Sequence, residues 1–187
     1  MALNPECILI KAAQRGDQQA FATLYRSHVD RIYRYVLYRV DNNAVAEDLT
    51  ADVFIRALEG LAHYECGPSP WIAWLYSIAN ARVIDYYRRN GRMGQQEVLE
   101  DSTASVDVDL DEQLMTTFSQ GLIQEAIRQL NSEQQQLIIY RFIEGYSLEK
   151  TAALLGKTIG AIKTMQHRAL AAMTKSIRKR GIKADDL

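Results

Sequence analysis

The stretch YSLEKTAALLGKTIGAIKTMQHRAL, residues 146–170, decides the fold of the C-terminal part of the chain. Ser147 is placed to cap a short helix, LEKTAALL, and Gly156 ends it because glycine readily adopts the left-handed conformation found after a helix. Thr158 then opens a second, long helix, IGAIKTMQHRALAAMTKSIRK. A short helix, a tight turn with glycine and a longer helix have the spacing of a helix-turn-helix.

The long second helix carries a polar and basic face. Its side chains recur at spacings of one, three and four, so they share one side of the helix: Lys163, Thr164, His167 and Arg168. Lys and Arg donate to guanine or phosphate, while Thr and His reach base edges with shorter side chains. We expect this face, with Thr158 at the helix start, to enter a DNA major groove; the alternative is an ordinary solvated basic face.

Apolar residues are available to close this motif. Ala152 and Ala153 are small enough for the two helices to cross closely. The predicted core positions are Leu148, Leu154, Leu155, Ile159, Ile162, Leu170 and Met173.

The net charge of −1 hides a very uneven distribution. Residues 93–127 contain eight acids and no Lys or Arg, which leaves 22 basic against 15 acidic residues elsewhere. From Lys150 to Lys183 there are nine basic residues and no acid. Basic segments of this kind are typical of proteins that bind nucleic acid.

The rest of the chain also has a helical pattern, because apolar residues recur at spacings of three and four and no stretch keeps a period of two. We predict an all-α fold with a helical domain over 1–90, a flexible acidic linker over 91–112 and a second helical domain over 113–187. The expected helices begin after an Asp17 cap, near Asn43, at Trp71 and, through a capping box with Gln135, at Ser132. The second is expected to bury Val45, Leu49, Val53, Phe54, Ala57 and Leu58.

Several classes of protein are disfavoured by the composition. No apolar run approaches the about 20 residues of a membrane span, and the N-terminus lacks a signal-peptide pattern, so we expect a cytoplasmic protein. Cys7 and Cys66 are far apart in sequence, which favours free thiols over a redox pair. No nucleophile elbow, phosphate loop or zinc spacing occurs, so we expect no catalytic residue, metal or cofactor.

Together with 130–170, three N-terminal blocks carry a family resemblance: AFATLYRSHVDRIYRYVLYRV (20–40), AEDLTADVFIRAL (46–58) and WIAWLYSIANARVIDYYRRN (71–90). The chain resembles the sigma-70 superfamily of bacterial sigma factors, in the extracytoplasmic-function (ECF) group. The resemblance implies region 2 and region 4 domains that bind core RNA polymerase, through its clamp and its flap respectively, and recognise promoter −10 and −35 elements. The basic face with Thr158 then becomes the −35 reader.

The resemblance also implies two sets of site residues in region 2. Clamp contact falls on Glu47, Asp48, Leu49, Asp52, Val53 and Phe54, although the three apolar residues have an equal claim to the internal core. Binding of the −10 element is assigned to Tyr64, Trp71, Asn80, Asp85, Arg88 and Arg89. Trp71 is also a candidate for the core. The family commonly has a basic residue and then Asn after its Ile-Ala pair, whereas here Asn80 follows Ala79 directly.

A restraining anti-sigma factor, which can hold the protein at the inner membrane, is a further expectation from the family. The acidic linker would thread towards the polymerase active-site cleft; the alternative is a plain tether. The rival function is a helix-turn-helix regulator that acts without core polymerase, but its usual phosphoreceiver domain alternates strands and helices, unlike this N-terminal half.

Overall fold

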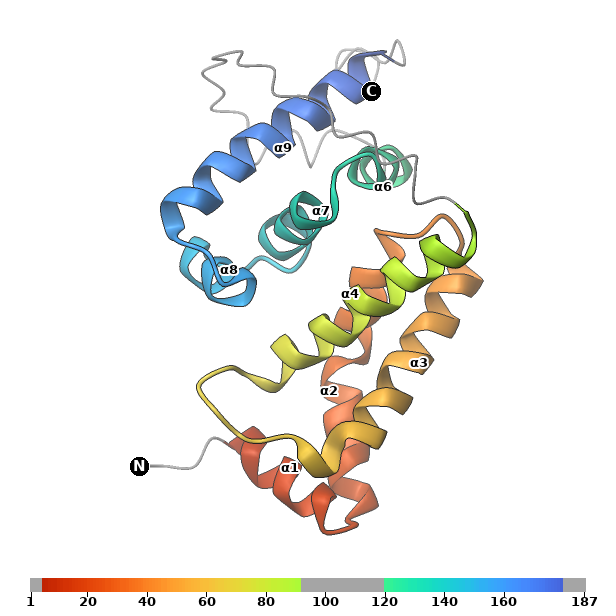
Figure 1. The fold of residues 1–187 in the computed structure, drawn as a ribbon, viewed down its shortest axis with the longest axis vertical. Coiled ribbons are helices and arrows are strands. Elements are labelled where there is room, and N and C mark those ends of the chain that lie inside the picture. Colours follow the sequence, from red (N-terminus) through yellow and green to blue (C-terminus); the bar gives the residue numbers. More distant parts are fainter. Residues whose placement is uncertain (1–4, 92–119, 180–187) are drawn as a thin grey trace. The chain divides into compact units, whose positions relative to one another are not determined.

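The computed structural model describes residues 5–91 and 120–179. The chain divides into two compact units, 1–90 and 91–187 (Figure 1). All regular structure in the described ranges is helical, which confirms the predicted all-α class. Apart from residue 91, the expected acidic linker lies outside the described residues.

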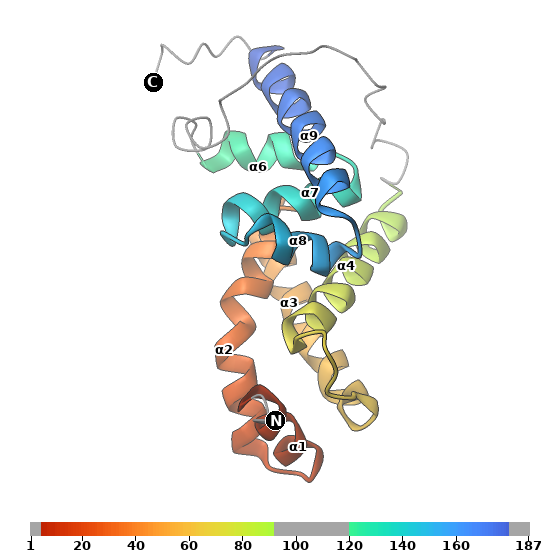
Figure 2. The same cartoon turned by 90° about the vertical axis from the view of Figure 1, so that its left-hand side faces the viewer.

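The first unit is a helical bundle formed by α1 (Pro5–Gln14), α2 (Gln18–Leu37), α3 (Asn43–Gly60), the 3₁₀ turn η1 (Leu61–His63) and α4 (Trp71–Arg89). Figures 1 and 2 show α2, α3 and α4 packed together, with α1 lying across one end of α2. The centre is apolar and dry: Ile32, Val36, Val53 and Leu75 are each 0% exposed. Burial of such side chains is the main favourable contribution to folding.

Local signals set the helix starts in this unit. Asp17 caps α2 as predicted, accepting hydrogen bonds from the Gln19 and Ala20 amides at 2.9 and 3.1 Å. Asn42 caps α3 in the same way. Helix α4 begins at Trp71, directly after Pro70, and ends at Arg89, as predicted.

One prediction for α3 is wrong. Leu58 is 54% exposed, not buried, and Ile55 beside it is 56% exposed. Helix α3 packs on α2 and α4 through the side that carries Val53, Phe54 and Ala57. Leu58 lies about 40° beyond Phe54 at the edge of that side, and Ile55 lies about 100° beyond it, so both reach solvent. An exposed apolar stripe results on α3.

The second unit contains α6 (Gln120–Arg128), α7 (Ser132–Ile138), a π-helical turn η2 (Ile139–Ile143), α8 (Leu148–Leu155) and α9 (Ile159–Lys179). Helix α9 packs on α6, α7 and α8. Of the predicted core, Ile162, Leu170 and Met173 are buried, whereas Ile159 is 41% exposed. Ile159 is the first residue of α9, so no preceding turn of that helix covers its side chain.

The caps of the helix-turn-helix are confirmed. Ser147 Oγ accepts from the Lys150 amide at 3.1 Å, and Gly156 ends α8 with a φ of 63°. The capping box of α7 lies one residue earlier than predicted, between Asn131 and Gln134. Gln135 is instead 1% exposed, because its amide turns inward. It donates to the carbonyl oxygens of Arg128 and Leu130 at the end of α6.

The prediction of free thiols is also wrong: Cys7 and Cys66 form a disulfide, with their Cα atoms 5.9 Å apart. They are 59 positions apart in the chain, and nothing in the local sequence indicated that they would be close in space. It arises because α1 folds back against the turn η1 that follows α3. Within the described ranges, no helix is both long enough and apolar enough to cross a membrane.

Candidate functional site

The start of α9 presents the predicted polar face. Lys163, Thr164, His167 and Arg168 are all exposed, while Ile162 and Ala169, on the other side, are each 0% exposed. Thr158 is exposed too, and its Oγ1 caps the helix by accepting from the Ala161 amide at 3.2 Å. The structure therefore presents Lys163, Thr164, His167 and Arg168 on one open side of the N-terminal half of α9, backed by core, with Thr158 at the cap before the helix.

Long side chains fix the direction of α9. Lys157 Nζ, in the turn before it, lies 3.1 Å from Glu133 Oε1 on α7. Arg141 donates from Nε to Gln166 Oε1 at 3.2 Å and also bonds the Tyr146 carbonyl. These contacts join α9 and the turn before it to the π-helical turn and to α7, so the exposed polar face of α9 is held at a set angle to them.

On α3 the six predicted interface residues separate into two groups. Glu47 and Asp48 are exposed and Leu49 and Asp52 half-buried, whereas Val53 is 0% and Phe54 5% exposed. Phe54 packs edge-on against Tyr25 of α2, with ring centroids 4.7 Å apart. Val53 and Phe54 therefore belong to the internal core, and the exposed apolar residues of this helix are Ile55 and Leu58.

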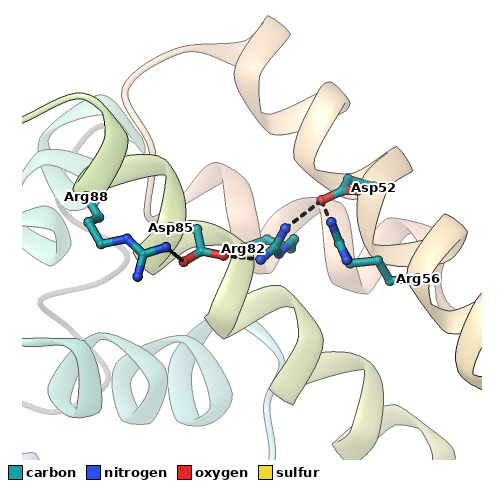
Figure 3. Close-up of polar contacts among 5 residues, drawn as sticks. All are labelled: Asp52, Arg56, Arg82, Asp85 and Arg88. Carbon is teal, nitrogen blue, oxygen red and sulfur yellow. Dashed lines mark hydrogen bonds and ion pairs between the residues drawn. The ribbon is translucent and has the colours of Figure 1, made fainter.

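Asp52 and Asp85, which were assigned to different interfaces, are linked by a chain of ion pairs (Figure 3). Asp52 Oδ2 lies 3.3 Å from Arg56 Nε and 3.4 Å from Arg82 Nη1. Arg82 also pairs with Asp85, whose other oxygen lies 3.0 Å from Arg88 Nη2. This chain joins α3 to α4, and sequence analysis missed Arg82, although its three-residue spacing from Asp85 was a usable signal.

Tyr64 heads the loop before α4 and lies in an aromatic cluster. Its ring centroid is 4.7 Å from Trp71 and 4.9 Å from Trp74. Burial raises the pKa of Tyr64 above its ordinary value, and the nearby Glu6 carboxylate adds to the rise. Trp71 is 1% exposed and so supports the loop from within instead of offering a face to a base.

Asn80 takes part in a buried polar network. Arg39 is 1% exposed and donates from Nη1 to Asn80 Oδ1 at 2.8 Å and to the Tyr35 hydroxyl. The Tyr87 hydroxyl donates to the Arg39 carbonyl oxygen. The Asn80 side-chain oxygen is thus occupied inside the bundle, where it helps to satisfy a buried guanidinium.

Comparison with known proteins places both units. Residues 24–93 match the family "Sigma-70 region 2" and residues 120–173 match "Sigma-70, region 4". The RNA polymerase sigma factor YlaC of Bacillus subtilis is 32% identical over 83% of this chain and 91% of its own length. The ECF RNA polymerase sigma factor SigX of the same organism is also 32% identical, over 84% of each chain. The chain belongs to the ECF sigma factors.

Further similarities agree with this family. The ECF RNA polymerase sigma factor BldN of Streptomyces coelicolor is 34% identical over 89% of this sigma factor, which spans 64% of BldN. A solved structure of CnrH in complex with the cytosolic domain of CnrY shares the fold, with a TM-score of 0.66 and 21% identity over 94% of this chain and 99% of CnrH. The sigma factor RpoE, solved with the anti-sigma factor NepR from Bartonella quintana, has a TM-score of 0.58 and 24% identity, with coverages of 84% and 96%.

Helix α4 of this sigma factor has an open side that differs from the predicted one. Its exposed residues recur at three and four positions: Ser77, Ala81, Ile84 and Arg88, followed by Arg89. Ala81 stands where the family pattern has Asn, one residue after the half-buried Asn80. The open side therefore offers a methyl group at that position and two guanidinium groups at the helix end.

The structure brings together only part of the six predicted −10 residues. Arg88 and Arg89 lie on the exposed end of α4, Tyr64 is half-buried, and Asp85 is held between Arg82 and Arg88. Trp71 and Asn80 have internal roles. Among the residues that the structure describes, no three His, Cys, Asp or Glu side chains gather as metal ligands would.

Proposed function

We propose that this sigma factor binds core RNA polymerase through α3, recognises promoter −10 and −35 elements through the 64–70 loop with α4 and through α9, and performs no catalysis of its own. The observation that supports it best is the polar face of α9, exposed on one side and backed by core on the other. Such a helix can enter a major groove without disturbing its own packing.

In this proposal α9 reads the −35 element. Lys163 and Arg168 donate to guanine edges or phosphates, and Thr164 and His167 make the shorter contacts. Ile159, 41% exposed at the start of the helix, adds an apolar surface of the kind that contacts a thymine methyl group. Thr158 acts mainly as a cap, which leaves the first turn of the helix ordered against DNA.

Helix α3 supplies the polymerase contact. Ile55 and Leu58 provide an apolar centre, and Glu47 and Asp48 provide negative charge on the exposed part of the same helix. An apolar centre with charged residues around it is the usual composition of a specific protein interface. Asp52 is half-buried and shared between Arg56 and Arg82, so we assign it a positioning role between α3 and α4.

The −10 element is captured between the loop and the end of α4. A protein without ATP can favour a melted strand only by offering its bases and phosphates better contacts than the duplex does. Tyr64 supplies an aromatic ring, and Arg88 and Arg89 supply positive charge for the strand backbone. Asp85 orients Arg88 by pairing with it at 3.0 Å.

The same faces suit a restraining partner. CnrH and RpoE, which share this fold, were each solved in complex with a second protein, the latter an anti-sigma factor. We propose that an anti-sigma factor binds this protein as well and prevents core polymerase from reaching α3. The proposed site of action is beside the chromosome, in the cytoplasm, with region 4 contacting the polymerase flap.

The proposal is tested by mixing the purified chain with core RNA polymerase and assaying run-off transcription on genomic fragments. We expect discrete transcripts that neither core nor this chain produces alone. Active core that yields no specific transcript would contradict the proposal. If the chain alone bound the same fragments specifically and core added nothing, the helix-turn-helix regulator would be the better account.

A further inference from the structure

Helix α1 lies outside the matched region 2 family, which begins at residue 24, yet its side chains reach the loop that precedes α4. Gln14 Nε2 donates to the carbonyl oxygens of Leu61 and Tyr64, at 2.9 and 2.8 Å. These bonds join residues 47 and 50 positions apart. The N-terminal end of the loop is thereby fixed to the C-terminal end of α1.

The other end of the loop is held by the first turns of α1. Glu6 Oε2 accepts from the Trp71 amide at 3.2 Å, which caps α4 in place of Pro70, whose side chain makes no cap bond. Glu6 Oε1 lies 2.9 Å from Nε2 of the buried His28, so the carboxylate is itself held in place. A carboxylate at a helix N-terminus also interacts favourably with the helix dipole.

Between these two anchors lies the only covalent one. Cys66 sits in the middle of the loop and is bonded to Cys7, the neighbour of Glu6. The loop is therefore attached to α1 at its start, middle and end. Of these attachments, the disulfide alone can be made or broken by a change in redox conditions.

We propose that Cys7 and Cys66 form a reversible thiol–disulfide site whose oxidation fixes the 64–70 loop in position to capture the −10 strand. The inference rests on the proposed function for the role of the loop. A protein that works beside the chromosome meets thiol reductants that keep most cysteines reduced, and disulfides that do form there are usually transient and regulatory. Under resting conditions Cys7 and Cys66 are then free thiols, and the disulfide forms when the cell is exposed to an oxidant.

The chemistry requires an external oxidant, for which a small disulfide such as oxidised glutathione suffices. One cysteine thiolate attacks a sulfur of the small disulfide, forming a mixed disulfide and releasing one small thiolate. The second cysteine thiolate attacks the protein sulfur of that mixed disulfide and releases the other small thiolate. Two protein thiols thus lose two protons and two electrons, and one small disulfide becomes two thiols.

Closing the bond affects DNA capture through preorganisation. A loop that is already ordered loses less conformational entropy when a base docks against it, so it binds more tightly with the same contacts. Tyr64, whose carbonyl is bound by Gln14 and whose ring packs on Trp71, is the group most directly positioned by this restraint. We expect the oxidised protein to engage the −10 strand roughly three- to tenfold more strongly than the reduced protein.

The first measurement follows the bond itself. The full chain is incubated in oxidised or reduced glutathione, alkylated with N-ethylmaleimide and weighed intact. We expect the oxidised monomer to take up no label and the reduced monomer two. Two labels after oxidation, or a bond that forms only between chains, would overturn the proposal.

The second measurement follows the consequence. Amide hydrogen exchange over residues 61–71 should be slower in the oxidised protein, and run-off from a promoter recovered in the genomic screen should be higher at limiting sigma factor. Cys7→Ser and Cys66→Ser are the matched controls, because each removes the bond and leaves Gln14 and Glu6 in place. In both variants, loop exchange and run-off should match those of the reduced wild type, whether or not oxidised glutathione is present.

These readouts separate the inference from the proposed function. If every preparation transcribes equally and loop exchange does not depend on redox state, the thiol–disulfide inference fails and the sigma-factor function stands. If no preparation transcribes, the proposed function fails. The exchange measurement then still decides whether the bond restrains the loop: redox-dependent protection supports that part of the inference, and equal exchange overturns it.

Discussion

Region 2 and region 4 both cap helices locally, at Asp17 and Asn42 in region 2, but region 2 also depends on polar contacts of a different kind. In region 2 the important ones join residues far apart in sequence: Gln14 to the Tyr64 carbonyl, and Arg39 to Asn80, 41 positions away. In region 4 the helix starts are fixed by side chains that bond an amide three residues later, at Asn131, Ser147 and Thr158. It has long-range bonds as well, such as the one that Ser176 of α9 donates to Gln129, which follows α6.

The difference matches what each unit is proposed to do. Region 4 presents one helix to an intact double helix, and local caps suffice to keep that helix ordered. Region 2 must hold a loop and the end of α4 against a melted strand. Its long-range contacts converge on these two parts, as Figure 3 shows for the ion pairs that link α3 to α4.

The largest effect is expected from removing the buried guanidinium of region 2. Arg39→Ala removes the bonds that the guanidinium donates to the Asn80 oxygen and the Tyr35 hydroxyl and opens a cavity, so the free energy of unfolding should fall by about 3 kcal/mol. Urea denaturation of the full chain measures this. The control is Arg56→Ala, since Arg56 is exposed, and its loss should lie within about 0.5 kcal/mol. Equal losses would mean that the Arg39 network does not hold region 2 together.

A base contact on α9 comes next in size. Arg168→Ala should weaken binding to the −35 element by about 1–3 kcal/mol, and Lys163→Ala should behave similarly. Lys175→Ala is the matched control, because it removes an exposed cation from the same side of α9 about two turns further along, beyond the predicted reading residues. The affinity of holoenzyme for promoter fragments measures both. If the Lys175 variant lost as much affinity as the Arg168 variant, α9 would be attracting DNA by charge alone.

Charge reversal on α3 should act on polymerase binding and leave stability unchanged. Asp48→Arg places a cation where an acid is expected to meet a basic partner, and we expect core affinity to fall about tenfold, or about 1.4 kcal/mol. Asp30→Arg, an exposed reversal on α2, is the control and should bind core normally. Normal core binding by the Asp48 variant would show that the polymerase interface has been assigned to the wrong residues.

The smallest effect tests the caps of region 4. Asn131→Ala should lower the free energy of unfolding by about 1 kcal/mol, because the Gln134 amide loses its acceptor. Ser132→Ala, at the position that the sequence suggested for the cap, should cost clearly less. A calorimetric unfolding transition for each variant separates the two positions, and the reverse order would restore the original placement of the capping box.

The same contrast between local and long-range contacts explains which features could be predicted from the sequence. Helix caps and terminating glycines act within four residues, so Asp17, Ser147 and Gly156 were predicted from local sequence. The capping box was placed one residue too late, because the Gln135 side chain bonds the Leu130 carbonyl oxygen inside the unit. Contacts over 40 or more positions leave no local trace. The Cys7–Cys66 bond, the Arg39 network that occupies Asn80 and the Glu6 cap on α4 were therefore missed.

The site residues follow the same rule. Helical spacing alone correctly grouped Lys163, Thr164, His167 and Arg168, because one face of a helix is fixed by its period. It could not say which face of α3 is open, since that depends on where α2 and α4 pack. Val53 and Phe54 were therefore left with equal claims to the clamp interface and to the core, where they lie. Leu58 was expected to be buried and Ile55 was not singled out, although both are exposed.

Promoter-dependent run-off with purified core polymerase tests the account most directly when wild type, Asp48→Arg and Arg168→Ala are compared on one recovered promoter. The account predicts a specific transcript with wild type. With the Asp48 variant the transcript should return when core is added in excess, and with the Arg168 variant it should return when promoter DNA is added in excess. Transcription that needs no added chain, or that both variants support at wild-type level, would contradict it.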